Sequence, residues 1–220
     1  MLCCSKRHQA PGVRFTYGAS SIGAIEYYTP DILNIFYGEA KHVLKISDDL
    51  GFYFGAQFTH QQSLGENLLT GDSFYGHQVG LLGEVGYRNA ILSFAYTKDG
   101  DGADLRNPWS SYLGYTSMQI RDFNRAGEQA FMIKGSYDWK RLAPGLSSYV
   151  EYTLGDGRQD PLTGRGLSNE SELDADVQFR LTKGVWDGFW LRLRYARLWE
   201  EGGRTGQQVR VTLNFPISFL

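Results

Sequence analysis

The sequence predicts an all-β protein, specifically an antiparallel transmembrane β-barrel of the bacterial outer membrane. Three observations lead to this fold class. Apolar and polar residues alternate with period two over most of the chain, which is the pattern of β-strands with one apolar face. The segments that alternate are longer than the strands of most soluble sheets, and the connections between them are alternately short and long.

The composition of the 220 residues excludes several other classes. Aromatic residues make up 15% of the chain and the formal net charge is −2, which excludes a disordered chain and argues against nucleic acid as a partner. The 27 glycines disfavour a helical bundle. Mean hydropathy is −0.36 and no apolar run could form a transmembrane helix, but barrel strands hide their lipid-facing residues at every second position.

The strands can be followed along the chain from its N-terminal end. Residues 1–12 show no alternation and no recognisable signal peptide, so we expect a disordered or non-native tail there and the barrel over residues 13–220. Weaker alternation predicts one or two strands at Val13–Tyr17 and Ile22–Tyr28. Stronger alternation predicts strands at Ile32–Ile46, Leu50–Gln62, Phe74–Tyr87, Ala90–Lys98, Glu128–Trp139, Leu146–Leu154, Glu172–Thr182, Asp187–Trp199 and Thr205–Phe219.

The last three of these strands show the alternation most clearly. In the final strand the odd positions from Val209 are apolar, whereas the even positions begin with Arg210 and Thr212. The two preceding strands place Arg180, Arg192 and Arg194 on their polar faces. In a barrel the apolar face meets lipid and the polar face lines the lumen, so these cations are predicted to face the lumen.

The connections favour a barrel over a soluble antiparallel domain whose polar face meets water. Short turns are predicted at 47–49, 88–89, 140–145 and 183–186, and longer polar loops at 63–73, 99–127, 155–171 and 200–206. Outer-membrane barrels have short periplasmic turns and longer outer loops. A soluble sheet has no reason to place all its short turns at one end.

Several motifs then resemble a known family. The block NPWSSYLGYTSMQIRDFNRAGEQA at 107–130 is followed by SYDW at 136–139 and PGLSSYVEYTLGDG at 144–157, and YYTPDILNIFYGEA stands at 27–40. In length and order these motifs resemble the OprD family of outer-membrane porins. The resemblance implies an eighteen-stranded barrel, of which about ten strands are present here as its C-terminal part.

The same resemblance implies a function and a set of residues. Members of this family are channels for passive, substrate-specific uptake of small carboxylates such as amino acids or organic acids, without catalysis or cofactor. Their ladder of basic lumen residues corresponds here to Arg180, Arg192, Arg194 and Arg210, with Lys134 a weaker candidate. The alternative is that these cations serve only as ion-pair partners of acids on the same wall: Glu151, Glu172, Asp174 and Asp176.

The loop 99–127 is too long for a plain connection and is rich in aromatic residues that need a surface to bury against. We expect it to fold into the lumen and narrow it, and packing over the outer rim is the alternative. Its candidate constriction residues are Asp104, Arg106, Tyr112, Tyr115, Asp122 and Arg125.

A second hypothesis is an independent ten-stranded outer-membrane barrel with an enzymatic or adhesive rim, at which His60 and His77 would lie. Such a barrel would close by pairing Thr205–Phe219 with Val13–Tyr17. The four histidines have no metal-ligand spacing, so no metal site is expected. The expected partners are outer-membrane lipid and small carboxylates, and a homo-oligomer is left open.

Overall fold

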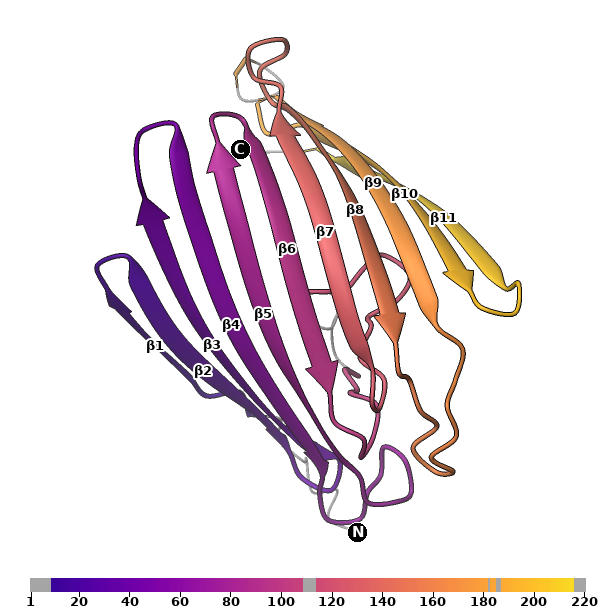
Figure 1. Cartoon of the computed structure of the whole chain (residues 1–220). Helices are drawn as coiled ribbons and strands as arrows, with labels where there is room; N and C mark the ends of the chain where they lie inside the picture. The colour runs from indigo at the N-terminus through magenta and orange to yellow at the C-terminus, as the bar shows by residue number, and fades with distance from the viewer. Residues whose placement is uncertain (1–8, 109–113, 182, 185–186, 216–220) are drawn as a thin grey trace.

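The computed structural model describes residues 9–108, 114–181, 183–184 and 187–215. These residues form one antiparallel sheet in which eleven strands follow each other in sequence order (Figure 1). The strands are β1 (Gly12–Tyr17), β2 (Ser20–Thr29), β3 (Leu33–Lys45), β4 (Leu50–Ser63), β5 (Tyr75–Tyr87), β6 (Ala90–Asp99), β7 (Gln129–Asp138), β8 (Leu146–Asp156), β9 (Glu170–Arg180), β10 (Trp190–Glu200) and β11 (Thr205–Asn214).

The antiparallel sheet predicted from alternation is confirmed. Both weaker candidates are strands, β1 and β2, so the described residues contain eleven strands rather than about ten. Pairing with β2 also begins before residue 13, because Gln9 and Tyr28 form an isolated bridge with N–H to O distances of 3.0 and 2.9 Å. Residues 1–8 of the expected tail lie outside the described residues.

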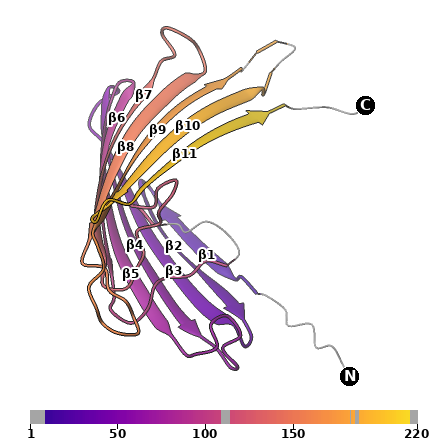
Figure 2. The same ribbon diagram turned by 90° about the vertical axis from the view of Figure 1, so that its right-hand side faces the viewer.

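The two faces of the sheet have opposite chemistry. The sheet is strongly curved, and the connection between β6 and β7 lies on its concave side (Figure 2). One face carries exposed apolar residues, among them Val209, Val211 and Leu213 with 63%, 63% and 66% exposure. The side chains buried on the concave side are largely polar: Gln57, Thr59, Gln61, Gln78, Ser93, Thr97, Thr153, Glu172, Asp174 and Asp176. This inverted distribution is the one that a lipid-facing barrel wall requires.

The apolar core is small and lies beneath the long connection. Leu105, Phe123 and Ala126 of that connection are buried, as are Ala130 of β7 and Leu198 of β10. Chain from the connection between β6 and β7 therefore covers the concave face near the strand ends at which Ala130 and Leu198 lie, and the packing there holds this connection in position.

Connection lengths agree with the predicted alternation only in part. The connections at 64–74, 100–128 and 157–169 are long and lie at one end of the sheet, and the turns at 18–19, 46–49 and 88–89 lie at the other. However, the predicted long loop at 200–206 is only 201–204, and the predicted short turn at 183–186 lies within a connection of 181–189. Alternation shows which residues of a strand face each side of the sheet, but it does not show at which residue the backbone pairing ends.

The sheet has two open edges in the described part of the chain. β1 pairs with β2, β11 pairs with β10, and no described residue of β1 pairs with β11. The closing contact required by an independent ten-stranded barrel is thus not formed between the described residues. The same residues include no helix that is long and apolar enough to span a membrane.

Candidate functional site

The predicted basic residues lie on the concave face of adjacent strands. Strand register places Arg194 of β10 directly between Asp176 of β9 and Arg210 of β11. Arg192 stands one step along the same face of β10, opposite Gln178. Period-two alternation brings these side chains to one surface because every second residue of a strand points the same way.

Arg192 and Arg194 share one carboxylate. Arg192 Nε donates to Asp176 Oδ2 at 2.5 Å, and Arg194 Nε lies 3.9 Å from the same oxygen. Arg192 also donates to the hydroxyl oxygen of Tyr149 at 3.4 Å. Asp176 is buried while both guanidinium groups stay partly exposed. Two cations thus lie beside one carboxylate of β9, and together they carry more N–H donors than this carboxylate can accept.

Lys134 of β7 has a more complete set of partners. Its ammonium lies 3.0 Å from Glu151 Oε2 and 3.9 Å from the centre of the Tyr149 ring. The pairing with an acid of the same wall, which the sequence left open, is therefore present for Lys134. It is present as well for Arg192 and Arg194, which pair with Asp176.

Arg210 and Arg180 stand in different surroundings. Arg210 Nη2 donates to the carbonyl oxygen of Gln119, 2.9 Å away in the connection between β6 and β7. Arg180 is exposed at the turn end of β9, where it lines a cavity of about 660 Å³ together with Gln178 and Trp190. The structure thus brings Arg192, Arg194 and Arg210 together and leaves Arg180 near the turn end of the sheet.

The connection between β6 and β7 folds across the concave face of the sheet (Figure 2). The backbone N–H of Gln119 donates to Asp174 Oδ2 at 2.9 Å. Both oxygens of Glu172 accept backbone N–H groups as well, from Ile120 at 2.7 Å and from Arg121 at 2.9 Å. Acids of β9 therefore bind the loop itself.

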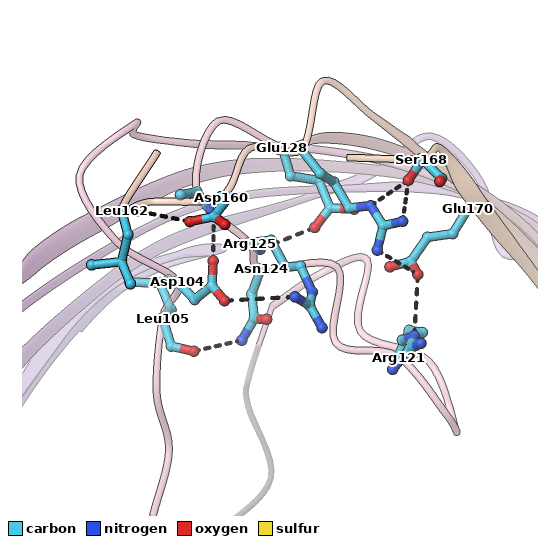
Figure 3. A network of polar contacts seen from close by, with 12 residues as sticks. Asp104, Leu105, Arg121, Asn124, Arg125, Glu128, Asp160, Leu162, Ser168 and Glu170 are labelled. Atoms are coloured by element: carbon cyan, nitrogen blue, oxygen red, sulfur yellow. Dashed lines mark hydrogen bonds and ion pairs between the residues drawn. The ribbon is translucent and has the colours of Figure 1, made fainter. Parts of the chain in front are cut away.

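Ion pairs extend this attachment toward the loop end of the sheet (Figure 3). Arg121 Nε lies 3.1 Å from Glu170 Oε2, and Arg121 Nη2 donates to Glu200 at the end of β10. Arg158 Nη1 contacts the same Glu170 oxygen at 2.7 Å. Glu170 is thus shared by two arginines from different loops and ties these loops together.

The start and the end of the loop are joined by Asp104 (Figure 3). Asp104 Oδ1 accepts the backbone N–H of Ala126 at 2.9 Å, and Arg125 Nη1 lies 3.9 Å from Asp104 Oδ2. Glu128 Oε2 accepts the backbone N–H of Arg125 at 3.0 Å. Burial raises the pKa of Glu128 to about 7, and the charge of Glu170 acts in the same direction.

The remaining loop candidates take different roles. Asp122 accepts the hydroxyl of Ser117 at 2.8 Å. Arg106 is held by its backbone, which exchanges two hydrogen bonds with the side chain of Gln61 at 2.6 and 2.7 Å.

The hydroxyl oxygen of Tyr115 lies against Gly55 of β4. Burial raises the pKa of Tyr115, and the charges of Glu39 and Tyr53 act in the same direction. Tyr112 lies outside the described residues.

Several residues that organise this site were not predicted as part of it. Glu170, Arg121 and Arg158 form the ion-pair network, and Thr97 and Thr116 are joined hydroxyl to hydroxyl at 2.7 Å. Gln61 and Gln78 hold the loop from the wall, since Gln78 Nε2 donates to the carbonyl oxygen of Phe123 at 3.4 Å. Buried polar residues on every second position of β4 and β5 are the sequence signal that could have indicated them.

In the part of the chain that the structure describes, no group of three or more histidine, cysteine or acidic side chains could hold a metal ion. The site consists of paired charges and backbone hydrogen bonds. Such groups can bind and orient a charged solute, and none of them forms a nucleophile with an adjacent base.

Comparison with known proteins identifies the family. The family model described as outer membrane porin, OprD family, matches residues 9–219. The chain belongs to the OprD family of outer-membrane porins. Its expected lack of enzymatic activity agrees with this family, which consists of channels. No match was found among the curated proteins.

Solved structures of Pseudomonas aeruginosa porins have the same fold. OpdK, solved with vanillate, superposes with a TM-score of 0.85 at 19% identity, covering 96% of this chain and 56% of OpdK. OpdL superposes with a TM-score of 0.84 at 17% identity, covering 94% of this chain and 57% of OpdL. OprD superposes with a TM-score of 0.82 at 18% identity, covering 96% of this chain and 59% of OprD. The chain therefore spans a little over half the length of these OprD-family porins.

Proposed function

We propose that the protein contributes the C-terminal part of a channel for passive, substrate-specific uptake of small carboxylates across the outer membrane. The observation that carries this proposal is the group of Arg192, Arg194 and Arg210 on the concave face of β10 and β11, beside an inward-folded loop. Guanidinium groups stay charged at all relevant pH values and bind carboxylates through two parallel hydrogen bonds.

The sharing of Asp176 supports this assignment. If every arginine had its own carboxylate, the wall would present no net attraction for an anion. Here one buried carboxylate, Asp176, serves both Arg192 and Arg194, so these two guanidinium groups do not each have a carboxylate of their own within 4.0 Å. A row of moderate sites also allows the solute to leave as readily as it enters.

The substrate class proposed is that of amino acids and organic acids. It is supported by the OpdK structure, because vanillate is a small aromatic carboxylate. The edges of β1 and β11 would pair with further strands of a larger barrel, since unpaired backbone groups cost several kcal/mol each in hydrocarbon. The proposal therefore treats the chain as a shortened or partial form of the usual eighteen-stranded barrel.

Uptake into proteoliposomes tests the proposal. The rates for vanillate and for its neutral amide would be compared between the native protein and the Arg192→Ala, Arg194→Ala double variant. Each guanidinium stabilises a carboxylate by roughly 1 kcal/mol in a watery passage, so we expect at least about fivefold slower vanillate uptake with little change for the amide.

The matched control is Arg88→Ala, which removes an exposed arginine at the turn between β5 and β6. This variant should leave both rates unchanged. Equal vanillate rates in the native and the double-variant proteins, both above the rate of vesicles without protein, would show that the arginines serve only as structural partners of Asp176.

A further inference from the structure

Glu172 is completely buried, and both of its carboxylate oxygens accept hydrogen bonds from the backbone of the loop between β6 and β7. Ile120 N–H donates to Oε1 at 2.7 Å, and Arg121 N–H donates to Oε2 at 2.9 Å. Asp174, next on the same face, accepts the N–H of Gln119 at 2.9 Å. Three consecutive backbone amides thus end on two acids of one strand.

This arrangement fixes the loop more firmly than surface packing would. Successive N–H groups of an irregular segment normally point in different directions and are satisfied by water. Here the two oxygens of the buried Glu172 accept two of them, and removing such an acceptor would leave buried N–H groups unpaired at a considerable cost in free energy. The carbonyl oxygen of Gln119 is held in addition by Arg210 of β11, so both sides of this peptide segment are attached to the wall.

The segment therefore crosses the concave face from β9 to β11 and covers β10 between them. Consistent with this path, Ala196 and Leu198 of β10 are buried although they face the concave side. Ile120 and Leu198 both approach Gly206 of β11, with atoms within 4.0 Å of the place that a side chain on Gly206 would occupy.

We infer that Glu172, assisted by Asp174, is the positioning residue of the constriction. Its carboxylate sets how far the segment 119–121 stands from the wall and thereby sets the width of the passage beside Arg194 and Arg210. Glu172 takes part in none of the ion pairs between described residues, and its two oxygens are directed to the loop backbone rather than to a cation of the ladder. The statement about width rests on the proposed channel function, whereas the statement about loop position does not.

Trypsin cleavage after Arg121 measures loop position without any transport assay. The folded protein in detergent would be compared with Glu172→Gln, Glu172→Ala and Asp174→Asn. Glu172→Ala removes the acceptors of two backbone amides, and the loss of two such hydrogen bonds raises the population of released loop by roughly tenfold or more, so cleavage should accelerate by at least about that factor. Glu172→Gln keeps one acceptor oxygen but places an NH2 group against the other backbone amide, so its cleavage rate should lie between those of the native protein and Glu172→Ala.

Glu84→Gln is the matched control, because Glu84 is an acid of the wall that accepts the hydroxyl of Ser93 at 2.7 Å and forms no hydrogen bond or ion pair with the described residues of the loop. Its cleavage rate should equal that of the native protein. If Glu172→Ala and Asp174→Asn retain the heat-modifiable folded form and are cut no faster than Glu84→Gln, the positioning role is refuted.

Single-channel conductance then separates the two proposals. In a working channel, Glu172→Ala should conduct more than the native protein and discriminate less between vanillate and its amide. Accelerated cleavage with unchanged conductance and unchanged discrimination, in a barrel where further strands pair with β1 and β11, would overturn the proposed function and keep the positioning role. Unchanged cleavage in a protein that does form channels would overturn the positioning role and keep the proposed function.

Discussion

Arg192 of β10 and Asp176 of β9 are joined by a 2.5 Å contact on the concave face, and this single carboxylate is also the nearest anion to Arg194. The pair lies where two neighbouring strands bring opposite charges to adjacent positions. How much of each arginine's charge a passing solute experiences therefore depends on Asp176.

Neutralising Asp176 should increase anion selectivity. Asp176→Asn keeps the shape and an acceptor oxygen but removes the negative charge, so both guanidinium groups become fully available. We expect the reversal potential in a salt gradient to move toward the anion, by an amount corresponding to roughly 1 kcal/mol at about 4 Å separation in a watery passage. An unchanged or cation-directed potential would contradict the assignment of Arg192 and Arg194 to the lumen.

The opposite faces of the sheet should tolerate charge very differently. Leu193 lies between Arg192 and Arg194 and is 48% exposed on the apolar face. Leu193→Arg should destabilise the folded barrel by about 2–4 kcal/mol if the position is near the middle of the membrane. Ser136→Arg, on the concave side of β7, should lower the free energy of unfolding much less. Denaturant unfolding in lipid vesicles compares the two variants. Equal losses of unfolding free energy, or a larger loss for Ser136→Arg, would contradict the assignment of the apolar face to lipid.

Gly55 should resist even a small side chain. A methyl group there would stand 2.6 Å from the hydroxyl oxygen of Tyr115, so the loop residue would have to move. Gly55→Ala is expected to lower stability by about 1 kcal/mol or more, as overpacking does elsewhere. Gly83→Ala is the control, because nothing lies within 4 Å of the methyl group that it adds. Similar melting temperatures for the two variants would show that Tyr115 is not seated against β4.

Glu128 should make the stability of the loop depend on pH. Its pKa is raised to about 7, so the folded form holds the proton more tightly than the unfolded form does. For a carboxyl group with a raised pKa, the contribution to stability is largest below the unfolded value and declines as pH rises toward the folded value.

Wild-type stability relative to Glu128→Gln should therefore fall between about pH 4.5 and pH 7, by a total on the order of 3 kcal/mol at most. Unfolding midpoints of the two proteins at pH 4.5 and pH 8 provide the measurement. A difference between them that is the same at both pH values would contradict the prediction.

Much of the fold could be predicted from the sequence because the signal is local. A strand repeats every two residues, so the alternation from Val209 onward and the polar positions of Arg192 and Arg194 are visible without any knowledge of neighbouring strands. The long strands, the absence of a long apolar run and the motifs at 107–157 led to the same fold and to the same family, and the structure and the family match confirm both.

The partners of the charged residues depended on the tertiary structure. Glu172 and the amide groups of Ile120 and Arg121 are some fifty residues apart, and nothing in either segment indicates that they meet. Their contact requires the register of β9 and the path of the loop together. An acid row next to an arginine row suggests ion pairs by spacing alone, whereas the folded chain directs Asp176 to the arginines and Glu172 to a backbone. Which residues share the polar face is visible in the sequence, because it follows from the local geometry of a strand. Which of them hold the loop and which remain open to a solute depends on contacts between segments far apart in the chain.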